Sequence, residues 1–389
     1  MTRIVFTEAG SDPGDLFPFT LTRKAQDIRL GIFTIRQKWE QYLGLSSFDT
    51  PGANKADPQR ALPEGLSGKE MICLVRCNSL PPNNIAGKIK KLLPGEALSL
   101  PGEAPFLHYL SVEQFRNERA LLPAKVHTTD ETKVLQFPWE IFTLNRWALK
   151  QDFGFIRKKR KRISVSRTNK VINDKNVFLE KGCSIEHCTI NATEGPVYIA
   201  KNALVMEGSM LRGPVSIGEG AVVKMGTRIY GATTIGPFCT VGGEIKNSVI
   251  FSYSNKAHDG YLGDSVIGEW CNLGAGTSNS NIKNSASEIK VHTPFGNKAV
   301  GNKCGLLMGD YSRSAINTSF NTGTVVGTCA NVFGTGLTPR YIPSFSWGID
   351  GTRYRYEKAI EHVGNWKALK QQILTTNEAS LLESIYHYH

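Results

Sequence analysis

The chain has 389 residues and a formal net charge of +12, from 46 basic and 34 acidic side chains. Hydrophobic residues make up 40% and charged residues 21%, which excludes a disordered chain, and no apolar run approaches the roughly 18–20 residues that span a bilayer, which excludes a membrane protein. Because no export signal is visible, we expect a cytoplasmic protein whose eight cysteines are reduced. The positive charge predicts anionic partners.

Residues 1–155 are expected to form a small α/β domain. The segment ICLVRC (72–77) has the composition of a strand, and residues 28–41 have helical spacing. Cys73 and Cys77 have a spacing that could begin a metal site, but no second Cys or His pair with matching spacing follows them. Buried structural cysteines are therefore the favoured interpretation, and no metal site is predicted.

A run of six basic residues, 157–162, carries half of the net charge. Two interpretations are open: a solvated linker at residues 156–164, which we favour, or a segment that contacts phosphate. No sequence motif of a nucleic-acid-binding domain accompanies the run. Neither nucleic acid nor a membrane is therefore expected as a partner.

An aliphatic residue recurs at every sixth position from residue 199 to residue 241, without a slip. The positions are Ile199, Val205, Leu211, Ile217, Val223, Ile229, Ile235 and Val241. Period six is typical of the hexapeptide repeat of a parallel β-helix, in which three short strands close each coil and the aliphatic residue points inward. Other copies occur at Leu179, Ile185, Ile267, Leu273, Val300 and Val326, so a β-helix is expected at residues 165–340.

Two features of the repeat region predict a site. Residues 18 apart should stack on adjacent coils, and Arg228 and Lys246 have this separation without an obvious acidic partner. Two such cations favour a phosphate between them, although two solvated charges remain the alternative. The register fails between Val241 and Ile267, where a bulge containing His258 is predicted, since bulges re-aim side chains for chemistry.

Residues 341–389 are expected to form a helical tail. The spacing of apolar residues after residue 355 predicts one or two helices, with a further short helix from Glu378 to Tyr386. These helices would cap the last coil or pack against another subunit. The apolar positions are Tyr356, Ile360, Val363, Leu369 and Ile373.

The segment HDGYLGDSVIGEWCNLGAGTSNSN (258–281) resembles the acetyltransferase domain of the bacterial bifunctional enzymes that make UDP-N-acetylglucosamine. That family has a His, then Tyr-Leu-Gly-Asp, Ile-Gly, Asn-x-Gly-Ala-Gly-Thr and an Asn, and every element occurs here. The resemblance covers roughly residues 165–335. It implies a left-handed β-helix, a homotrimer and acetyl-CoA as the acyl donor.

The same resemblance implies roles for individual residues. His258 falls on the position of the general base, which suits a side chain with a pKa near 6.5. Ala275 falls in the part of the motif that binds the acyl donor. In a departure from the family, Ile282 replaces a Tyr, and an extended segment follows at 283–298. The residues for sugar phosphate are Arg228, Lys246, Tyr261, Asn272 and Asn281.

Residues 14–32, GDLFPFTLTRKAQDIRLGI, resemble the start of the sugar-phosphate nucleotidyltransferases. That family binds a triphosphate with a Gly-x-Gly-x-Arg loop, whereas the loop here, AGSDPGD (9–15), offers Asp12 and Asp15, which would repel it. Ala25 stands at the position of the family's lysine. We therefore expect a short, degenerate nucleotidyltransferase-like domain, with Mg²⁺ needed only if it is active.

The leading hypothesis is an acyl-CoA-dependent N-acetyltransferase acting on an amino-sugar phosphate, such as glucosamine 1-phosphate, in sugar-nucleotide synthesis. One alternative is nucleotidyl transfer by the first domain, and another is a non-catalytic scaffold that binds sugar nucleotides. A metal-dependent hydratase on the same fold would need three converging histidines, and the relevant stretch has only His258 and His292.

Overall fold

The computed structural model describes residues 2–8, 13–49, 67–116 and 122–388, which form two compact units. Unit 1 consists of Met1–Asp12, Lys24–Ile28 and Phe33–Gln136, and unit 2 of Pro13–Arg23, Arg29–Ile32 and Phe137–His389. The chain thus passes between the units several times near its start. The limits 1–155, 156–164, 165–340 and 341–389 stay a prediction.

Unit 1 is the α/β domain expected from the sequence, built on a six-stranded sheet of order β2-β1-β3-β6-β5-β7. Its central strands β1 and β3 are parallel and buried over their middle residues, which explains the apolar residues there. The strands are β1 (Thr2–Thr7), β2 (Ser47–Asp49), β3 (Met71–Arg76), β4 (Ser79–Leu80), β5 (Glu96–Ser99), β6 (Pro105–Ser111), β7 (Lys125–Thr128) and β8 (Lys133–Val134). The helices are η3 (Ala25–Asp27), α1 (Ile35–Leu43), α2 (Ile85–Ile89) and α3 (Val112–Arg116).

Helix α1 begins later than the helix predicted at residues 28–41. Thr34 accepts a hydrogen bond from the amide of Gln37, and the Gln37 side chain accepts one from the Thr34 amide. This capping box fixes the start of the helix at Ile35. Gly44, in the left-handed conformation with φ of 67°, ends it.

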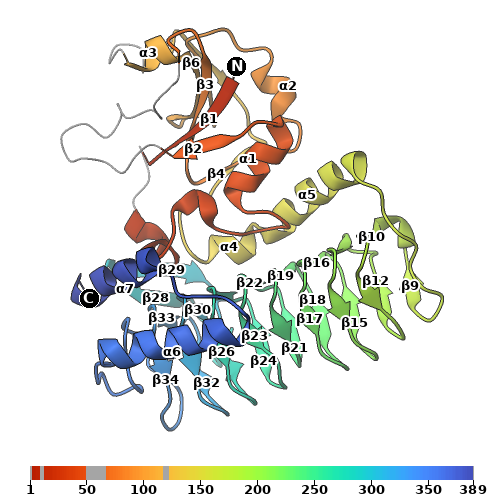
Figure 1. Cartoon of the computed structure of the whole chain (residues 1–389), viewed down its shortest axis with the longest axis vertical. Coiled ribbons are helices and arrows are strands. Elements are labelled where there is room, and N and C mark those ends of the chain that lie inside the picture. The colour runs from red at the N-terminus through yellow and green to blue at the C-terminus, as the bar shows by residue number, and fades with distance from the viewer. Residues whose placement is uncertain (1, 9–12, 50–66, 117–121, 389) are drawn as a thin grey trace. The chain divides into compact units, whose positions relative to one another are not determined.

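Unit 2 contains a left-handed parallel β-helix with three faces, as predicted (Figure 1). Face 1 consists of β10 (Val177–Leu179), β13 (Val197–Ile199), β16 (Val215–Ile217), β19 (Thr233–Ile235), β22 (Val249–Ile250), β25 (Val266–Ile267), β30 (Leu307–Met308), β33 (Val325–Val326) and β35 (Tyr341–Ile342). Face 2 consists of β11 (Ser184–Ile185), β14 (Leu204–Val205), β17 (Val222–Val223), β20 (Thr240–Val241), β23 (Asn255–Lys256), β26 (Asn272–Leu273), β31 (Arg313–Ser314) and β34 (Asn331–Val332). Face 3 consists of β9 (Lys170–Ile172), β12 (Thr189–Asn191), β15 (Met210–Arg212), β18 (Arg228–Tyr230), β21 (Glu244–Lys246) and β24 (Tyr261–Gly263), with the pair β27 (Ser278–Asn279) and β32 (Ser319–Phe320) beyond it.

The eight aliphatic residues of the hexapeptide series all lie in the core of the β-helix, each at most 1% exposed. The prediction that they point inward is confirmed. Val326 is also inward, whereas the expectation for Val300 is wrong, because it lies in a hairpin of β28 (Ile289–Thr293) and β29 (Gly296–Gly301). This hairpin interrupts the coils between β27 and β30.

The predicted bulge between Val241 and Ile267 is also wrong, because the strands continue through it and the coil becomes shorter. Val241 pairs in register with Lys256, only 15 residues later. Most of the shortening comes from a tight turn, Gly242-Gly243, between β20 and β21, and the rest from the turn between β21 and β22. A side chain at Gly242 would meet the carbonyl oxygen of Ala257 at 2.3 Å, so the close approach of the two turns requires glycine.

The outer surface of face 1 is covered by other parts of unit 2. Thr234 donates a hydrogen bond of 2.9 Å to the carbonyl of Gly31, whose amide donates to Asn145 at 2.6 Å. The rings of Phe19 and Phe251 lie 5.4 Å apart. These contacts hold residues 13–23 and 29–32 on the β-helix, beside α5. The elements involved are η1 (Pro13–Leu16), η2 (Phe19–Leu21), α4 (Glu140–Thr143) and α5 (Asn145–Lys159).

Helices α6 (Tyr356–Leu369) and α7 (Thr376–Tyr388) confirm the predicted helical tail. Val363 of α6 and Leu382 and Ile385 of α7 pack on aromatic residues at turns of the last coils, among them Trp270, Tyr311 and Phe345. The expected apolar positions Leu369 and Ile373 are instead exposed, at 75% and 79%. Lys367 of α6 pairs with Glu378 of α7 at 2.5 Å. In the described parts of the chain, no helix is long and apolar enough to cross a bilayer.

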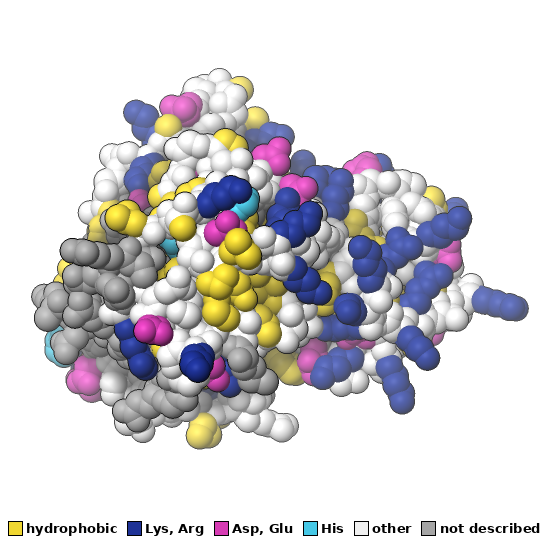
Figure 2. Space-filling view, turned by 90° about the horizontal axis from the view of Figure 1, so that it is seen from above, with side chains coloured by type: hydrophobic (Ala, Val, Ile, Leu, Met, Phe, Trp, Pro, Cys, Tyr) yellow, Lys and Arg dark blue, Asp and Glu magenta, His cyan; other side chains and the backbone are white. Residues whose placement is uncertain are grey.

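The basic run lies within unit 2, between α5 and the first coil. Its first three residues end α5, where positive charge is favourable to the helix dipole. Arg160 pairs with Glu180 at 2.5 Å, and Arg162 donates to the carbonyl oxygens of Asp174 and Val177. Figure 2 shows Lys and Arg side chains gathered over one part of the surface, with few acidic side chains among them.

Candidate functional site

The outer surface of face 3 carries an array of polar side chains on three successive strands. Arg228, Glu244 and Tyr261 stand opposite one another in register. Beside them, Tyr230 stands opposite Lys246. Neighbouring strands are about 4.8 Å apart, so these side chains lie within reach of a single small ligand.

The expected stacking of Arg228 on Lys246 is corrected by this register. The coil between β18 and β21 has 16 residues, so Arg228 stands opposite Glu244 and Lys246 is displaced by two positions. The assumption that the two cations lack an acidic partner is also wrong, because a Glu244 carboxylate oxygen lies 3.8 Å from the Arg228 guanidinium. Glu244 could have been found from the sequence, since both neighbours of the inward Ile245 must point outward.

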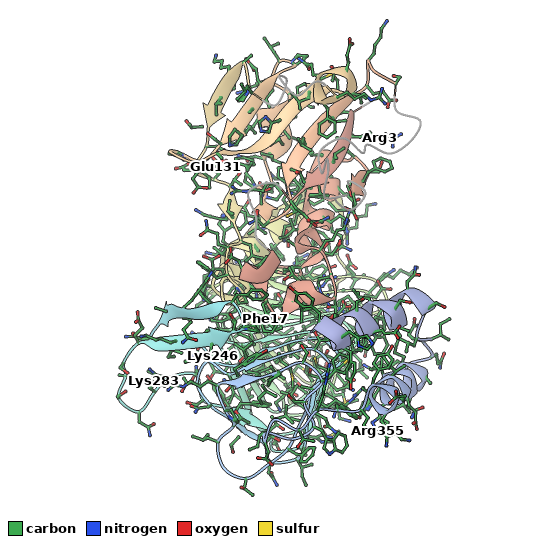
Figure 3. All side chains as sticks on the ribbon, turned by 90° about the vertical axis from the view of Figure 1, so that its left-hand side faces the viewer. Arg3, Phe17, Glu131, Lys246, Lys283 and Arg355 are labelled. Atoms are coloured by element: carbon green, nitrogen blue, oxygen red, sulfur yellow. The ribbon has the colours of Figure 1, made fainter. Side chains whose placement is uncertain are left out.

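Tyr230 connects this carboxylate to the lysine. Its hydroxyl donates a 2.7 Å hydrogen bond to Glu244, which raises the pKa of Tyr230 to about 12. The ammonium of Lys246 lies 5.7 Å from the centre of the Tyr230 ring, at cation–π distance. Figure 3 labels Lys246 on the β-helix, on the side of the view that also holds Lys283. The array therefore combines two cations with one carboxylate.

Tyr261 is held in place by its surroundings. Its hydroxyl accepts a hydrogen bond of 3.2 Å from Asn281, which also donates to Asp264 at 2.5 Å. Burial, reinforced by the Asp264 carboxylate, raises the pKa of Tyr261 to about 12. Its ring crosses directly over Gly263, where an added Cβ would meet the phenolic oxygen at 2.2 Å. Tyr261 and Asn281, both predicted to bind the sugar, are therefore in direct contact.

His258 lies in the turn that joins β23 on face 2 to β24 on face 3, and it is exposed. The next turn at this corner contains Ala275 and Gly276, and the Gly276 amide donates a 3.0 Å hydrogen bond to the carbonyl of Asp259. The turns that contain His258 and Ala275 are therefore stacked on each other. Both residues stand beside the end of the array on face 3.

Asn272 lies on a different face of the β-helix from Arg228, Lys246 and Tyr261. It belongs to β26 of face 2 and stands opposite Asn255, whose side-chain amide approaches it at 3.4 Å. Within one chain it therefore does not share a surface with Arg228 and Lys246.

Lys256 was missed because an inward position was expected to be aliphatic. Its side chain is 2% exposed inside the β-helix. Its ammonium donates hydrogen bonds to the carbonyl oxygens of Gly242, at 3.2 Å, and of His258. It is thus the buried neighbour of the candidate base.

The extended segment at residues 283–298 includes most of the hairpin β28–β29, which packs on the start of the chain. Lys298 pairs with Asp15 at 2.5 Å, and its ammonium lies 4.4 Å from the ring centre of Phe137. Phe295, at the tip, lies 5.8 Å from Phe17, which is labelled in Figure 3. Ile282, which precedes the segment, is exposed.

The run Leu21-Thr22-Arg23, within the N-terminal segment 14–32, also contacts the β-helix. Arg23 pairs with Asp310, lies 3.4 Å from Glu269 and stacks over the ring of Phe251. Thr22 donates a 2.6 Å hydrogen bond to the same Asp310. These side chains therefore have a structural role in unit 2.

Of the remaining positions that resemble the nucleotidyltransferases, the structure describes Ala25 but only part of the expected phosphate loop. Ala25, at the family's lysine position, is buried. Residues 9–12 of the expected phosphate loop, including Asp12, lie outside the described residues.

Comparison with known proteins gives matches to a family model, to curated relatives and to solved structures. Residues 4–161 match the family model of a sugar nucleotidyl transferase. The chain is 34% identical over 101 residues to the bifunctional protein GlmU of Methanocaldococcus jannaschii, covering 26% of this chain and 25% of that protein. It is 36% identical over 91 residues to a bifunctional sugar-1-phosphate nucleotidylyltransferase/acetyltransferase of Sulfurisphaera tokodaii, covering 23% of each.

Among solved structures, an Arabidopsis UDP-N-acetylglucosamine acyltransferase aligns with 52% of this chain and 77% of its own, at 15% identity and a TM-score of 0.30. The alignments to the two curated relatives span about a quarter of the length of each relative. The resemblance seen in the sequence is confirmed at this level: residues 4–161 match the sugar nucleotidyl transferase model, and about a quarter of the chain is similar to proteins named as bifunctional nucleotidyltransferase/acetyltransferases.

Proposed function

We propose that the protein is an N-acetyltransferase that transfers an acetyl group from acetyl-CoA to an amino-sugar phosphate such as glucosamine 1-phosphate. The observation that carries the proposal is the array on face 3, where Arg228, Lys246 and Tyr261 stand on successive strands beside the turn of His258. The bifunctional names of the curated relatives support the same reaction class.

In this proposal the two cations bind the phosphate, because guanidinium and ammonium groups make strong charge-assisted hydrogen bonds to phosphate oxygens. Glu244 orients Arg228 through its carboxylate, 3.8 Å away. The hydroxyl of Tyr261 and the amides of Asn281 and Asn272 provide neutral hydrogen bonds to the sugar.

His258 acts as the general base. Its imidazole takes a proton from the substrate ammonium, and the free amine attacks the thioester carbonyl of acetyl-CoA. The new C–N bond forms as the C–S bond breaks, the nitrogen gives up its second proton to become the amide, and the departing thiolate of CoA takes up that proton. General-base catalysis of this kind contributes typically about 10²–10⁴-fold to the rate.

We also propose that the active form is a homotrimer. Asn272 belongs to face 2, whereas Arg228, Lys246 and Tyr261 belong to face 3, so a complete set of sugar contacts requires a face of a second copy. Ala275, in the turn above His258, would then contact the acyl donor at the same junction. Light scattering tests this proposal, and a monomer at micromolar concentration contradicts it.

A second candidate activity is nucleotidyl transfer by the N-terminal domain, which the family match at residues 4–161 favours. Arg23, the basic residue of its Leu-Thr-Arg run, is bound to Asp310 and Glu269, which argues against a role for it in nucleotide binding. Mg²⁺ would be needed for this activity alone. Release of pyrophosphate from UTP with N-acetylglucosamine 1-phosphate and Mg²⁺ would establish it.

The decisive experiment is thiol release from acetyl-CoA with a panel of amino-sugar phosphates: glucosamine 1-phosphate, galactosamine 1-phosphate and glucosamine 6-phosphate. Saturable thiol release with one member supports the proposal. Without thiol release from any of them, binding of a sugar nucleotide would identify the protein as a non-catalytic scaffold instead.

A further inference from the structure

Lys256 occupies a place in the β-helix where most strands of face 2 have an apolar residue. In the inward column of face 2, Val223 stands opposite Val241, and Val241 stands opposite Lys256. Leu273 takes the corresponding place on the next strand, β26. Lys256 is the only charged side chain in this column among the described strands of face 2.

A buried ammonium destabilises a fold unless hydrogen bonds compensate for the lost water. Burial lowers the pKa of Lys256 to about 8, which measures this cost, although Asp259 acts in the opposite direction. The compensating bonds go to the carbonyl oxygens of Gly242 and His258, in two turns stacked at one corner. An aliphatic residue would fill the same space without the cost.

The main chain around His258 is fixed on two sides besides this lysine. Below it, a side chain at Gly243 would meet the carbonyl oxygen of His258 at 2.8 Å. Above it, a side chain at Gly260 would meet the carbonyl oxygen of Thr277 at 2.1 Å. The turn is therefore clamped between its neighbours, and the ammonium of Lys256 holds it from inside the β-helix.

We propose that Lys256 is a positioning residue, whose ammonium ties the main chain of His258 to the turn at Gly242 and so fixes the place of the imidazole beside the array on face 3. This inference rests on the proposed acetyltransferase function, with His258 as its base. Lys256 does not contact substrate in this role, and it moves no proton.

The consequence is a loss of turnover without a loss of binding when the ammonium is removed. Small errors in the position of a catalytic group cost up to about 100-fold in rate. The phosphate and sugar contacts on face 3 do not involve Lys256, so the KM for sugar phosphate should stay within about twofold. A merely structural residue would not separate the two constants in this way.

The test compares Lys256→Met with Leu273→Met in the full chain. Methionine matches the length of the lysine and removes both hydrogen bonds, while Leu273→Met changes the neighbouring inward position with little change in volume. We expect Lys256→Met to lower kcat by about 10- to 100-fold, with Leu273→Met within about twofold of wild type. At pH 7 Lys256→Met should melt no lower than wild type, because it removes the cost of burying the ammonium. Lys256→Arg keeps the donors and should recover part of the turnover.

A folded Lys256→Met protein with wild-type kcat overturns the proposal, as does an equal loss of kcat in Leu273→Met. If Lys256→Met does not fold, Lys256→Gln replaces it, because its shorter amide cannot reach both carbonyl oxygens. Full turnover of the Lys256→Gln protein would also contradict the proposal. A wild type without thiol release from acetyl-CoA instead overturns the proposed function, and with it the role of Lys256.

Discussion

Faces 1 and 3 of the β-helix each have inward aliphatic residues, but their outer surfaces differ. On face 1 the outer residues are buried under residues 13–23, residues 29–32 and α5, and Thr234 bonds to the backbone there. On face 3 the outer residues of β18, β21 and β24 include two cations, a carboxylate and two tyrosines. The repeat therefore specifies the scaffold, while the uncovered outer positions of one face carry the candidate site.

The largest effect expected from this difference is at the corner where face 3 begins. His258→Ala should lower kcat by about 10²- to 10⁴-fold, because it removes the proton acceptor for the substrate ammonium. The affinity for sugar phosphate, measured by calorimetry, should stay close to that of wild type. Full turnover in this variant would contradict the assignment of His258 as the base.

A smaller effect is expected at the two cations. Arg228→Ala and Lys246→Ala should each weaken binding of the sugar phosphate by about 10- to 150-fold, since a hydrogen bond to a charged group contributes roughly 1.5–3 kcal/mol. Arg212→Ala is the matched control, because it removes an exposed arginine of the preceding strand of face 3, paired with Glu194. Equal losses in all three variants would mean that face 3 acts through its general charge.

Gly263→Ala should have a smaller effect on the array, by displacing the ring of Tyr261, which lies over Gly263. The added methyl group would meet the ring of Tyr261, which must move. We expect the KM for sugar phosphate to rise about tenfold with little change in kcat. Gly364→Ala in α6, where a methyl group meets nothing within 4 Å, should leave both constants unchanged. A Gly263→Ala enzyme with wild-type KM would remove Tyr261 from the sugar site.

The smallest effect concerns stability and pH. Lys256 loses its proton near pH 8 in the folded protein but near 10.4 when unfolded, so between these values the unfolded state binds more protons and the wild type gains stability as pH rises. Relative to Lys256→Met, the gain is at most about 3 kcal/mol. Melting temperatures of both proteins at pH 7 and pH 10 measure it. A constant difference would show that Lys256 keeps its ordinary pKa.

The sequence was sufficient for the scaffold because inward aliphatic residues are a local, periodic signal. It failed where the period changed: the Gly242-Gly243 turn shortens the coil, and the inward Lys256 does not look like a core residue. The rule of 18 residues then paired Arg228 with the wrong partner and overlooked Glu244. Turn lengths, unlike inward positions, depend on packing between coils.

The cover of face 1 could not be predicted at all from local patterns. Thr22 and Arg23 bind Asp310, which lies 288 and 287 residues further along the chain. No periodicity within residues 13–32 indicates such a partner. In contrast, the motif of residues 258–281 identified His258, Tyr261 and Asn281 together, because short-range spacing places them on adjacent turns and strands.

The interleaving of the two units has a consequence for biosynthesis. Residues 13–23 and 29–32 leave the ribosome long before the coil that carries Asp310, so face 1 acquires its complete cover only when most of the chain has been made. Until Phe251 and Asp310 have been made, cover residues such as Phe19 and Arg23 lack their partners on the β-helix. A single cut near residue 136 therefore cannot yield an intact unit 2: the fragment would lack Phe19 and Arg23 and expose a surface prone to aggregation.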